Sequence, residues 1–127
     1  MQKRHIYLMF LLAAFVVMGQ GCKTTVVGPE GQTSAVYSFG TLSAEEPNGL
    51  DSVYQATINA LTELELSISQ KLKDELTAKV IARDAQDTKI TVDLVSITKD
   101  STKMKIRAGS FTRASRIYQM IHESLQK

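Results

Sequence analysis

Residues 103–108 read KMKIRA and form the clearest strand pattern in the chain. Apolar and basic residues alternate along them, and successive side chains of a strand point to opposite faces of a sheet. We therefore predict that Met104, Ile106 and Ala108 face inward, and that Lys103, Lys105 and Arg107 face outward. One buried face and one solvated face are typical of an antiparallel sheet.

Three shorter segments before this strand alternate in the same way, near residues 66–72, 78–83 and 89–95. Polar turns separate them, including Lys73-Asp74-Glu75 and Asp84-Ala85-Gln86-Asp87. In the first segment the alternation places four residues on one face: Leu66, Ile68, Gln70 and Leu72. Four strands joined by short polar turns predict an antiparallel meander.

A helix is expected on each side of this meander. The first follows a strand at 34–42 and should begin at Asp51 or Ser52, because Ser52-Val53-Tyr54-Gln55 matches a capping box, and should end near residues 63–65. The second should begin at Ser110 or Thr112. Its apolar stripe is Ile117, Met120, Ile121 and Leu125.

Together these elements predict a small α+β domain over residues 33–127. Their order is strand, helix, four strands and helix, which gives an antiparallel sheet of about five strands. An apolar sheet face and two amphipathic helices bury their apolar surfaces most simply by packing together. We therefore expect two layers, with both helices on one face of the sheet.

Residues 1–21 have the pattern of an export signal. Lys3 and Arg4 precede an apolar run from Ile6 to Met18. A membrane-spanning helix needs about 20 apolar residues, whereas the apolar part of a signal peptide needs about 7–15. We predict that this segment is the cleaved signal peptide of a lipoprotein. The alternatives are ordinary secretion without a lipid and an uncleaved membrane anchor.

Cys22 is the single cysteine of the chain and has no partner for an intramolecular disulfide. It follows Gly21 at the end of the leader, in a pattern that resembles the lipobox of bacterial lipoproteins. Gly19 and Gln20 stand where Leu or Val, and Ala or Ser, are usual. We expect cleavage between Gly21 and Cys22, and acylation of Cys22 by groups such as palmitate.

The residues after the cysteine, 22–32, are predicted to be a lipidated N-terminus and tether with a turn at 28–31. Lys23 follows the cysteine, in place of the Asp that retains some lipoproteins in the inner membrane. The protein is thus expected to be exported and anchored in the cell membrane or on the periplasmic face of the outer membrane, with the latter favoured.

The layout resembles the bacterial family called domain of unknown function 3568. Three features carry the resemblance: the leader ending at Cys22, the helix start Asp51-Ser52-Val53-Tyr54-Gln55-Ala56 followed by Ala60-Leu61, and the ending Lys105-Ile106-Arg107-Ala108-Gly109. Ser115, Ile117 and Ile121 match the family's last helix, whereas Leu64-Glu65 stands where the family often has Leu-Gly. The resemblance implies a lipoprotein but no activity.

The composition gives little support to catalysis or nucleic-acid binding. The chain has 15 Lys and Arg against 13 Asp and Glu, and it becomes formally neutral when Lys3 and Arg4 leave with the leader. We expect no metal, cofactor, catalytic residue or nucleic-acid partner. His122 is expected to be half-exposed near a helix end, and three acidic pairs are expected to be solvated: Glu45-Glu46, Glu63/Glu65 and Asp74-Glu75.

Arg107, Arg113 and Arg116 form the single candidate ligand site, because the end of the last strand and the start of the last helix bring them near one another. Ordinary exposed arginines are the alternative. We therefore predict a non-enzymatic envelope lipoprotein, held to the bilayer by acylated Cys22, that binds or supports another envelope component. The alternative function is binding of a small anion or a lipid headgroup.

Overall fold

A computed structural model describes residues 24–27 and 34–127 of the chain. The predicted signal peptide 1–21, the cleavage site Gly21–Cys22 and the turn at 28–31 lie outside the described residues. The strands are β1 (Thr24–Val27), β2 (Ser34–Ser38), β3 (Thr41–Glu46), β4 (Ser67–Lys73), β5 (Thr77–Arg83), β6 (Lys89–Thr98) and β7 (Ser101–Arg107). The helices are α2 (Leu50–Glu63) and α3 (Phe111–Gln126).

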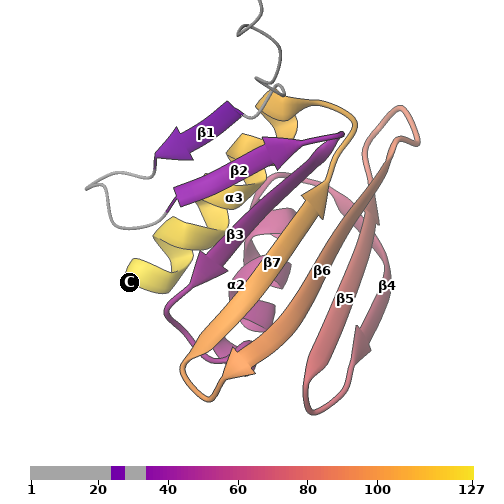
Figure 1. Ribbon diagram of the computed structural model, residues 1–127. Helices are drawn as coiled ribbons and strands as arrows, with labels where there is room; N and C mark the ends of the chain where they lie inside the picture. Colours follow the sequence, from indigo (N-terminus) through magenta and orange to yellow (C-terminus); the bar gives the residue numbers. More distant parts are fainter. Residues whose placement is uncertain (1–23, 28–33) are drawn as a thin grey trace, which may run out of the picture.

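All seven strands form one antiparallel sheet in the order β1-β2-β3-β7-β6-β5-β4. Both helices lie behind this sheet, as Figure 1 shows. The central pair, β3 and β7, joins segments far apart in the sequence, with Leu42 opposite Ile106 and Ala44 opposite Met104. The predicted two-layer α+β fold is confirmed.

The sheet has more strands than the five or so expected from the sequence. One reason is that the stretch predicted as a single strand over 34–42 turns back on itself at Phe39 and Gly40, which separates β2 from β3. The other is that Thr24–Val27, within the stretch predicted as a tether, pairs with β2 as a further strand.

The turn between β2 and β3 has an unusual composition. Phe39 and Gly40 have φ angles of 50° and 76°, and two positive φ angles are typical of a type I′ hairpin turn. Asn, Asp and Gly are usual at such positions, because a side chain with a Cβ loses about 1–2 kcal/mol in the left-handed conformation. Phe39 is nevertheless there, with its side chain in solvent.

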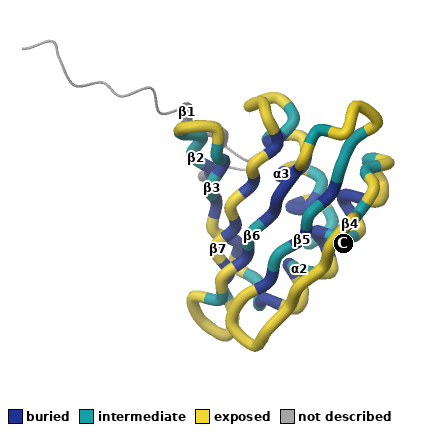
Figure 2. The backbone as a smooth tube through the Cα atoms, turned by 90° about the vertical axis from the view of Figure 1, so that its right-hand side faces the viewer, coloured by how far each residue is buried: buried dark blue, intermediate teal, exposed yellow. Residues whose placement is uncertain are grey.

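The helix-facing side of the sheet carries an aliphatic core. Burial alternates along β7, where Met104 and Ile106 are buried between exposed lysines, so the predicted orientation of this strand is confirmed. In Figure 2 the buried segments of the strands and of the two helices face one another. The largest buried side chains include Leu42, Leu61, Ile90, Leu94, Ile117, Tyr118 and Ile121.

The start of α2 differs from the predicted capping box. Its N-cap is Gly49, and no side chain caps the helix. A Cβ at Gly49 would lie 2.8 Å from the backbone oxygen of Lys99, so the close approach of the β6–β7 turn requires glycine. The tertiary contact, rather than a local hydroxyl, therefore sets where the helix begins.

The end of α2 keeps a glycine-like turn without a glycine. Glu65 has φ 59°, the left-handed conformation that a Gly after Leu64 would adopt easily. The backbone N–H groups of Leu64 and Leu66 donate to the carbonyls of Ala60 and Leu61, at 3.0 Å each. Leu64-Glu65, which stands where the family that the sequence resembles often has Leu-Gly, thus forms the same kind of turn.

The prediction for the edge strand β4 was wrong in part. A bulge between Ile68 and Gln70 shifts the register, so Ile68 lies opposite the buried Ala82 while Leu72 lies opposite Lys79. Leu72 is consequently 51% exposed. One extra residue in a strand moves the following side chains to the other face, which the apolar pattern alone does not reveal.

Candidate functional site

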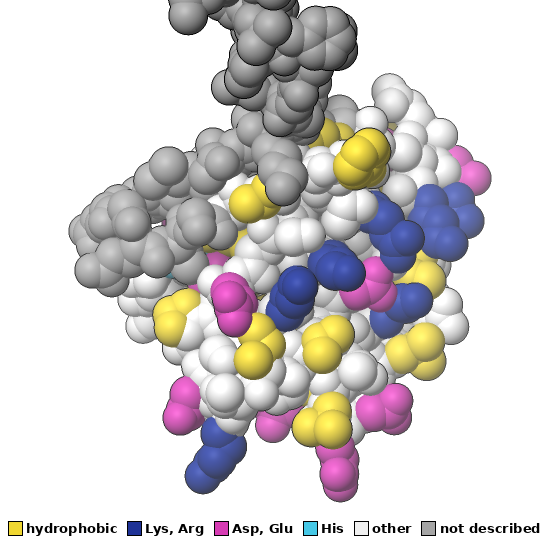
Figure 3. All heavy atoms as spheres, in the orientation of Figure 1, with side chains coloured by type: hydrophobic (Ala, Val, Ile, Leu, Met, Phe, Trp, Pro, Cys, Tyr) yellow, Lys and Arg dark blue, Asp and Glu magenta, His cyan; other side chains and the backbone are white. Residues whose placement is uncertain are grey.

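The face of the sheet opposite the helices is basic, and no described element covers it. The strand register places six basic side chains on this face against two acidic ones, Glu45 and Asp93. The basic residues are Lys79, Arg83, Lys89, Lys103, Lys105 and Arg107. Figure 3 shows this face, with Lys and Arg side chains in a band across its centre and an acidic group among them.

Asp93 organises the middle of this surface, which we call the open face. Its two carboxylate oxygens lie 3.3 Å from the Lys79 Nζ and 2.8 Å from the Arg107 Nη2. Lys103 and Lys105 form no ion pair within the described part of the chain. Lys89 likewise forms none, so three of the six basic groups on the open face have no ion pair among the described residues.

The shape of the open face suits a broad contact rather than an enclosed ligand. A shallow depression of about 510 Å³ is lined by Thr41, Ser43, Asp93, Val95, Lys103, Lys105 and Arg107. Two apolar side chains are exposed among the charges of this face: Val95 in the depression and Leu72 on the edge strand β4. An open, charged surface of this kind can meet a partner of complementary charge, whereas a small-molecule site is usually a concave pocket that encloses its ligand.

The three arginines predicted as a ligand site lie at one end of the fold but have different surroundings. Arg107 ends β7 on the open face and pairs with Asp93. Arg113, in the first turn of α3, places its Nη2 3.0 Å from Oδ2 of Asp84 and donates from Nη1 to the Ala108 carbonyl at 3.4 Å. Arg116 lies on the exposed side of α3.

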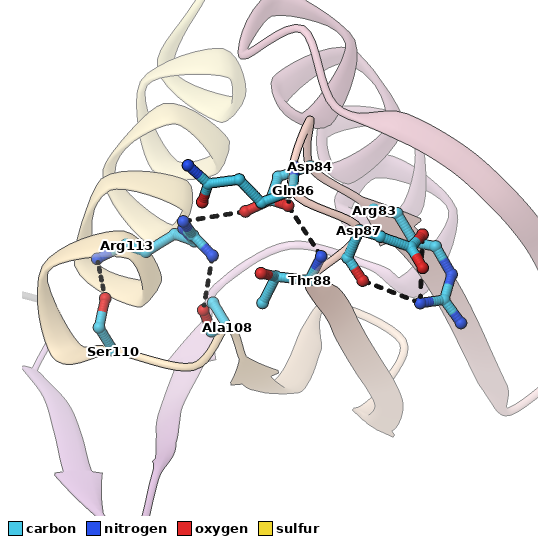
Figure 4. Close-up of polar contacts among 8 residues, drawn as sticks. All are labelled: Arg83, Asp84, Gln86, Asp87, Thr88, Ala108, Ser110 and Arg113. Carbon is cyan, nitrogen blue, oxygen red and sulfur yellow. Dashed lines mark hydrogen bonds and ion pairs between the residues drawn. The ribbon is translucent and has the colours of Figure 1, made fainter.

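Asp84 holds the β5–β6 turn against the start of α3, as Figure 4 shows. Its Oδ1 accepts hydrogen bonds from the backbone N–H groups of Thr88 (2.8 Å) and Gln86 (2.9 Å). These bonds, first that of Thr88, and the nearby charge of Arg113 hold the pKa of the Asp84 carboxyl below its usual value. Arg113 thus serves to join two structural elements.

The start of α3 follows the sequence prediction. Ser110 is the N-cap, and its side-chain oxygen accepts a hydrogen bond from the Arg113 N–H at 3.3 Å. Of the predicted apolar stripe, Ile117 and Ile121 are fully buried. Met120 and Leu125 are only partly buried, because Ala114, Tyr118 and His122 also face the sheet.

The predictions for His122 and Glu46 were wrong. Both side chains are buried, with exposures of 7% for His122 and 1% for Glu46, and the His122 Nδ1 lies 3.2 Å from Oε2 of Glu46. Glu46 ends β3 in phase with the inward-facing Leu42 and Ala44, and this period-two pattern was the signal that could have indicated its burial. The Tyr118 ring stacks on the His122 ring, with 6.0 Å between the ring centroids.

The buried pair has the features of a structural contact. A histidine beside a carboxylate is a common catalytic arrangement, but a catalytic group must reach its substrate. Both partners lie in the core between β3 and α3, away from the shallow depression of the open face. We therefore assign this pair to the packing of α3 on the sheet.

Two further features of the described residues bear on the site. The described residues contain no group of three or more His, Cys, Asp or Glu side chains placed to hold a metal ion. None of the helices in that part of the chain has the length and the apolar character to cross a membrane.

Comparison with known protein families places the chain. Residues 5–127 match a family described as Protein of unknown function (DUF3568), and this match covers nearly all of the chain. No curated protein matches the chain. The resemblance seen in the sequence is thereby confirmed at the level of the domain, and the chain belongs to the DUF3568 family.

Proposed function

We propose that this protein is a bacterial envelope lipoprotein whose small domain binds another envelope component and performs no catalysis. Acylated Cys22 anchors it in the cell membrane or on the periplasmic face of the outer membrane. Three sequence features support the anchor: the basic start of the leader, its apolar run, and a single cysteine after Gly21. Two or three acyl chains would give lasting attachment, since each buried CH₂ contributes about 0.8 kcal/mol.

The open face carries the proposal for binding. The sheet of seven strands presents one whole face that neither described helix covers. Lys103 and Lys105 lie at its centre without ion pairs among the described residues, beside the exposed Val95. The partner that fits this surface is a protein with an acidic patch that also carries apolar groups.

The alternative is a small anion or a lipid headgroup bound by Arg107, Arg113 and Arg116. It has less support, because the guanidinium groups of Arg107 and Arg113 are already paired with Asp93 and Asp84. An anion at either position would compete with an internal carboxylate.

Crosslinking in cells tests the proposal. Tagged wild type, a Lys103→Glu/Lys105→Glu variant and a Cys22→Ala variant would be crosslinked, purified and compared by mass spectrometry. A Lys71→Glu/Lys99→Glu variant is the matched control, since it makes the same charge change away from the open face. Labelling with a palmitate analogue would follow acylation in parallel.

We expect one discrete partner with the wild type and with the control. The Lys103→Glu/Lys105→Glu variant should lose this partner while remaining acylated, and the Cys22→Ala variant should lose both the label and the partner. Equal recovery of the partner by both charge-reversal variants would contradict the assignment to the open face. A wild type without palmitate label would contradict the anchor.

A further inference from the structure

The register of β1 fixes where the N-terminal end of the domain lies. Thr24, the first residue of β1, is opposite Tyr37 of β2, and Tyr37 is two positions before Phe39 in the turn. Figure 1 shows the start of β1 and the β2–β3 turn at the same end of the sheet. Cys22 precedes Thr24 by two residues, so the chain keeps it within about 7 Å of Thr24.

Phe39 stands out at this end of the molecule. Its side chain is 104% exposed, more than any other large apolar side chain of the described residues, and it lies at the tip of a hairpin. Its positive φ is also unfavourable for a residue with a side chain. Neither the core nor the geometry of the turn explains a phenylalanine here, because Asn or Gly would suit the turn better.

Two further aromatic residues lie near this end of the domain. Phe111, the first residue of α3, contacts the Tyr37 ring edge to face, with 5.2 Å between the ring centroids. Phe111 is itself partly exposed. The end of the sheet at which β1 begins therefore presents the exposed Phe39 and, on α3, the partly exposed Phe111.

We propose that this end of the domain contacts the lipid bilayer and that the Phe39 side chain inserts into it beside the acyl chains of Cys22. The inference rests on the proposed lipidation, which places a bilayer within reach of Thr24. Phe, like Trp and Leu, is among the apolar side chains that surface-bound proteins bury at the boundary between headgroups and acyl chains. Insertion would also orient the domain with its strands rising from the membrane, so that the open face points sideways toward a partner.

The chain offers a direct spectroscopic test, because it contains no tryptophan. The Phe39→Trp variant places the single tryptophan of the chain at the tip, where its emission can be excited apart from that of the tyrosines. The matched control is Leu76→Trp, since Leu76 is also exposed at a hairpin turn, between β4 and β5 at the opposite end of the sheet. Phe111→Trp adds a second reporter at the membrane end, should the first substitution disturb the turn.

Each full-length variant would be processed in cells, purified in detergent, checked for acylation by intact mass and incorporated into phosphatidylethanolamine–phosphatidylglycerol vesicles. Emission would be recorded with ordinary lipids and with lipids brominated along their acyl chains. For Phe39→Trp we expect a blue shift on incorporation and strong quenching by the brominated lipids. Phe111→Trp should be quenched less, and Leu76→Trp should keep the spectrum of an exposed indole.

Any result other than these would overturn a defined part of the inference. Equal quenching of the Phe39→Trp and Leu76→Trp variants in acylated protein would overturn insertion and leave the lipoprotein proposal standing. A blue shift without quenching by brominated lipids would show that protein, such as a second copy, covers the tip instead. An intact mass without acyl chains would overturn the lipidation and the insertion together.

Discussion

The two faces of the sheet are built from the same strands but have opposite properties. Along β7, Ile106 is fully buried beneath the helices, while its neighbour Lys105 lies exposed on the open face. The buried face is almost entirely aliphatic, and its main polar feature is the pair of Glu46 and His122. On the open face, in contrast, charged groups dominate and apolar groups are scattered.

This contrast separates what holds the fold together from what is available for binding. Burial of aliphatic side chains supplies most of the stabilisation of a small domain, and surface substitutions away from special features change it little. The open face can therefore vary in charge without loss of the fold. Substitutions on the buried face should therefore lower the free energy of unfolding, whereas substitutions on the open face should weaken partner binding.

The largest expected effect comes from the one polar pair on the buried face. His122→Ala removes the partner of the Glu46 carboxylate and leaves it buried. Loss of one member of a buried pair typically destabilises a protein by about 3–5 kcal/mol, so we expect a loss in this range in urea unfolding. The exposed Gln119→Ala in the same helix is the control.

The same pair allows a second comparison. Replacement of both partners by apolar residues of similar size is often close to neutral, so Glu46→Leu/His122→Leu should recover most of the stability lost in His122→Ala. If His122→Ala were no more harmful than Gln119→Ala, the pair would not contribute to the packing of α3 on the sheet.

A pair of neighbouring substitutions compares the two faces within one strand. Ile106→Ala leaves a cavity between the sheet and the helices and should reduce the free energy of unfolding by about 2–4 kcal/mol. Lys105→Ala, one residue away on the open face, should change it by less than about 0.5 kcal/mol. Similar losses from both substitutions, measured by urea unfolding, would contradict the division between the faces.

Local patterns in the sequence predicted most of the fold. Alternation along β7 identified its buried and open sides, and Ser110 was one of the two caps expected for α3. Such signals need only a few neighbouring residues. The α+β class follows from them directly.

The features missed from the sequence depend on contacts between distant residues. Glu46 and His122 are 76 positions apart, and no local pattern indicates that they meet. Gly49 is the cap of α2 because the Lys99 carbonyl approaches it from another turn. The lysines of the open face were recognised on their own strand, but the ion pairs of Asp93 with Lys79 and Arg107 become visible only once the strands are in register.

The smallest expected effect lies where the two faces meet, at the contact between Asp84 and Arg113. The Asp84 side chain is 12% exposed, and its pKa is lowered from the ordinary value of 3.8, first by the hydrogen bond from Thr88. Because the lowered pKa belongs to the folded state, this carboxylate stabilises the fold above pH 3.8, and its contribution is lost as the pH falls through the folded-state pKa.

Asp84→Asn should therefore be slightly less stable than the wild type at neutral pH, and the difference should disappear in acid. The measurement is urea unfolding of both proteins across this pH range, with Asp100→Asn, in the exposed β6–β7 turn, as the control. A difference that persists unchanged in acid would show that the turn depends on the shape of the Asp84 side chain rather than on its charge.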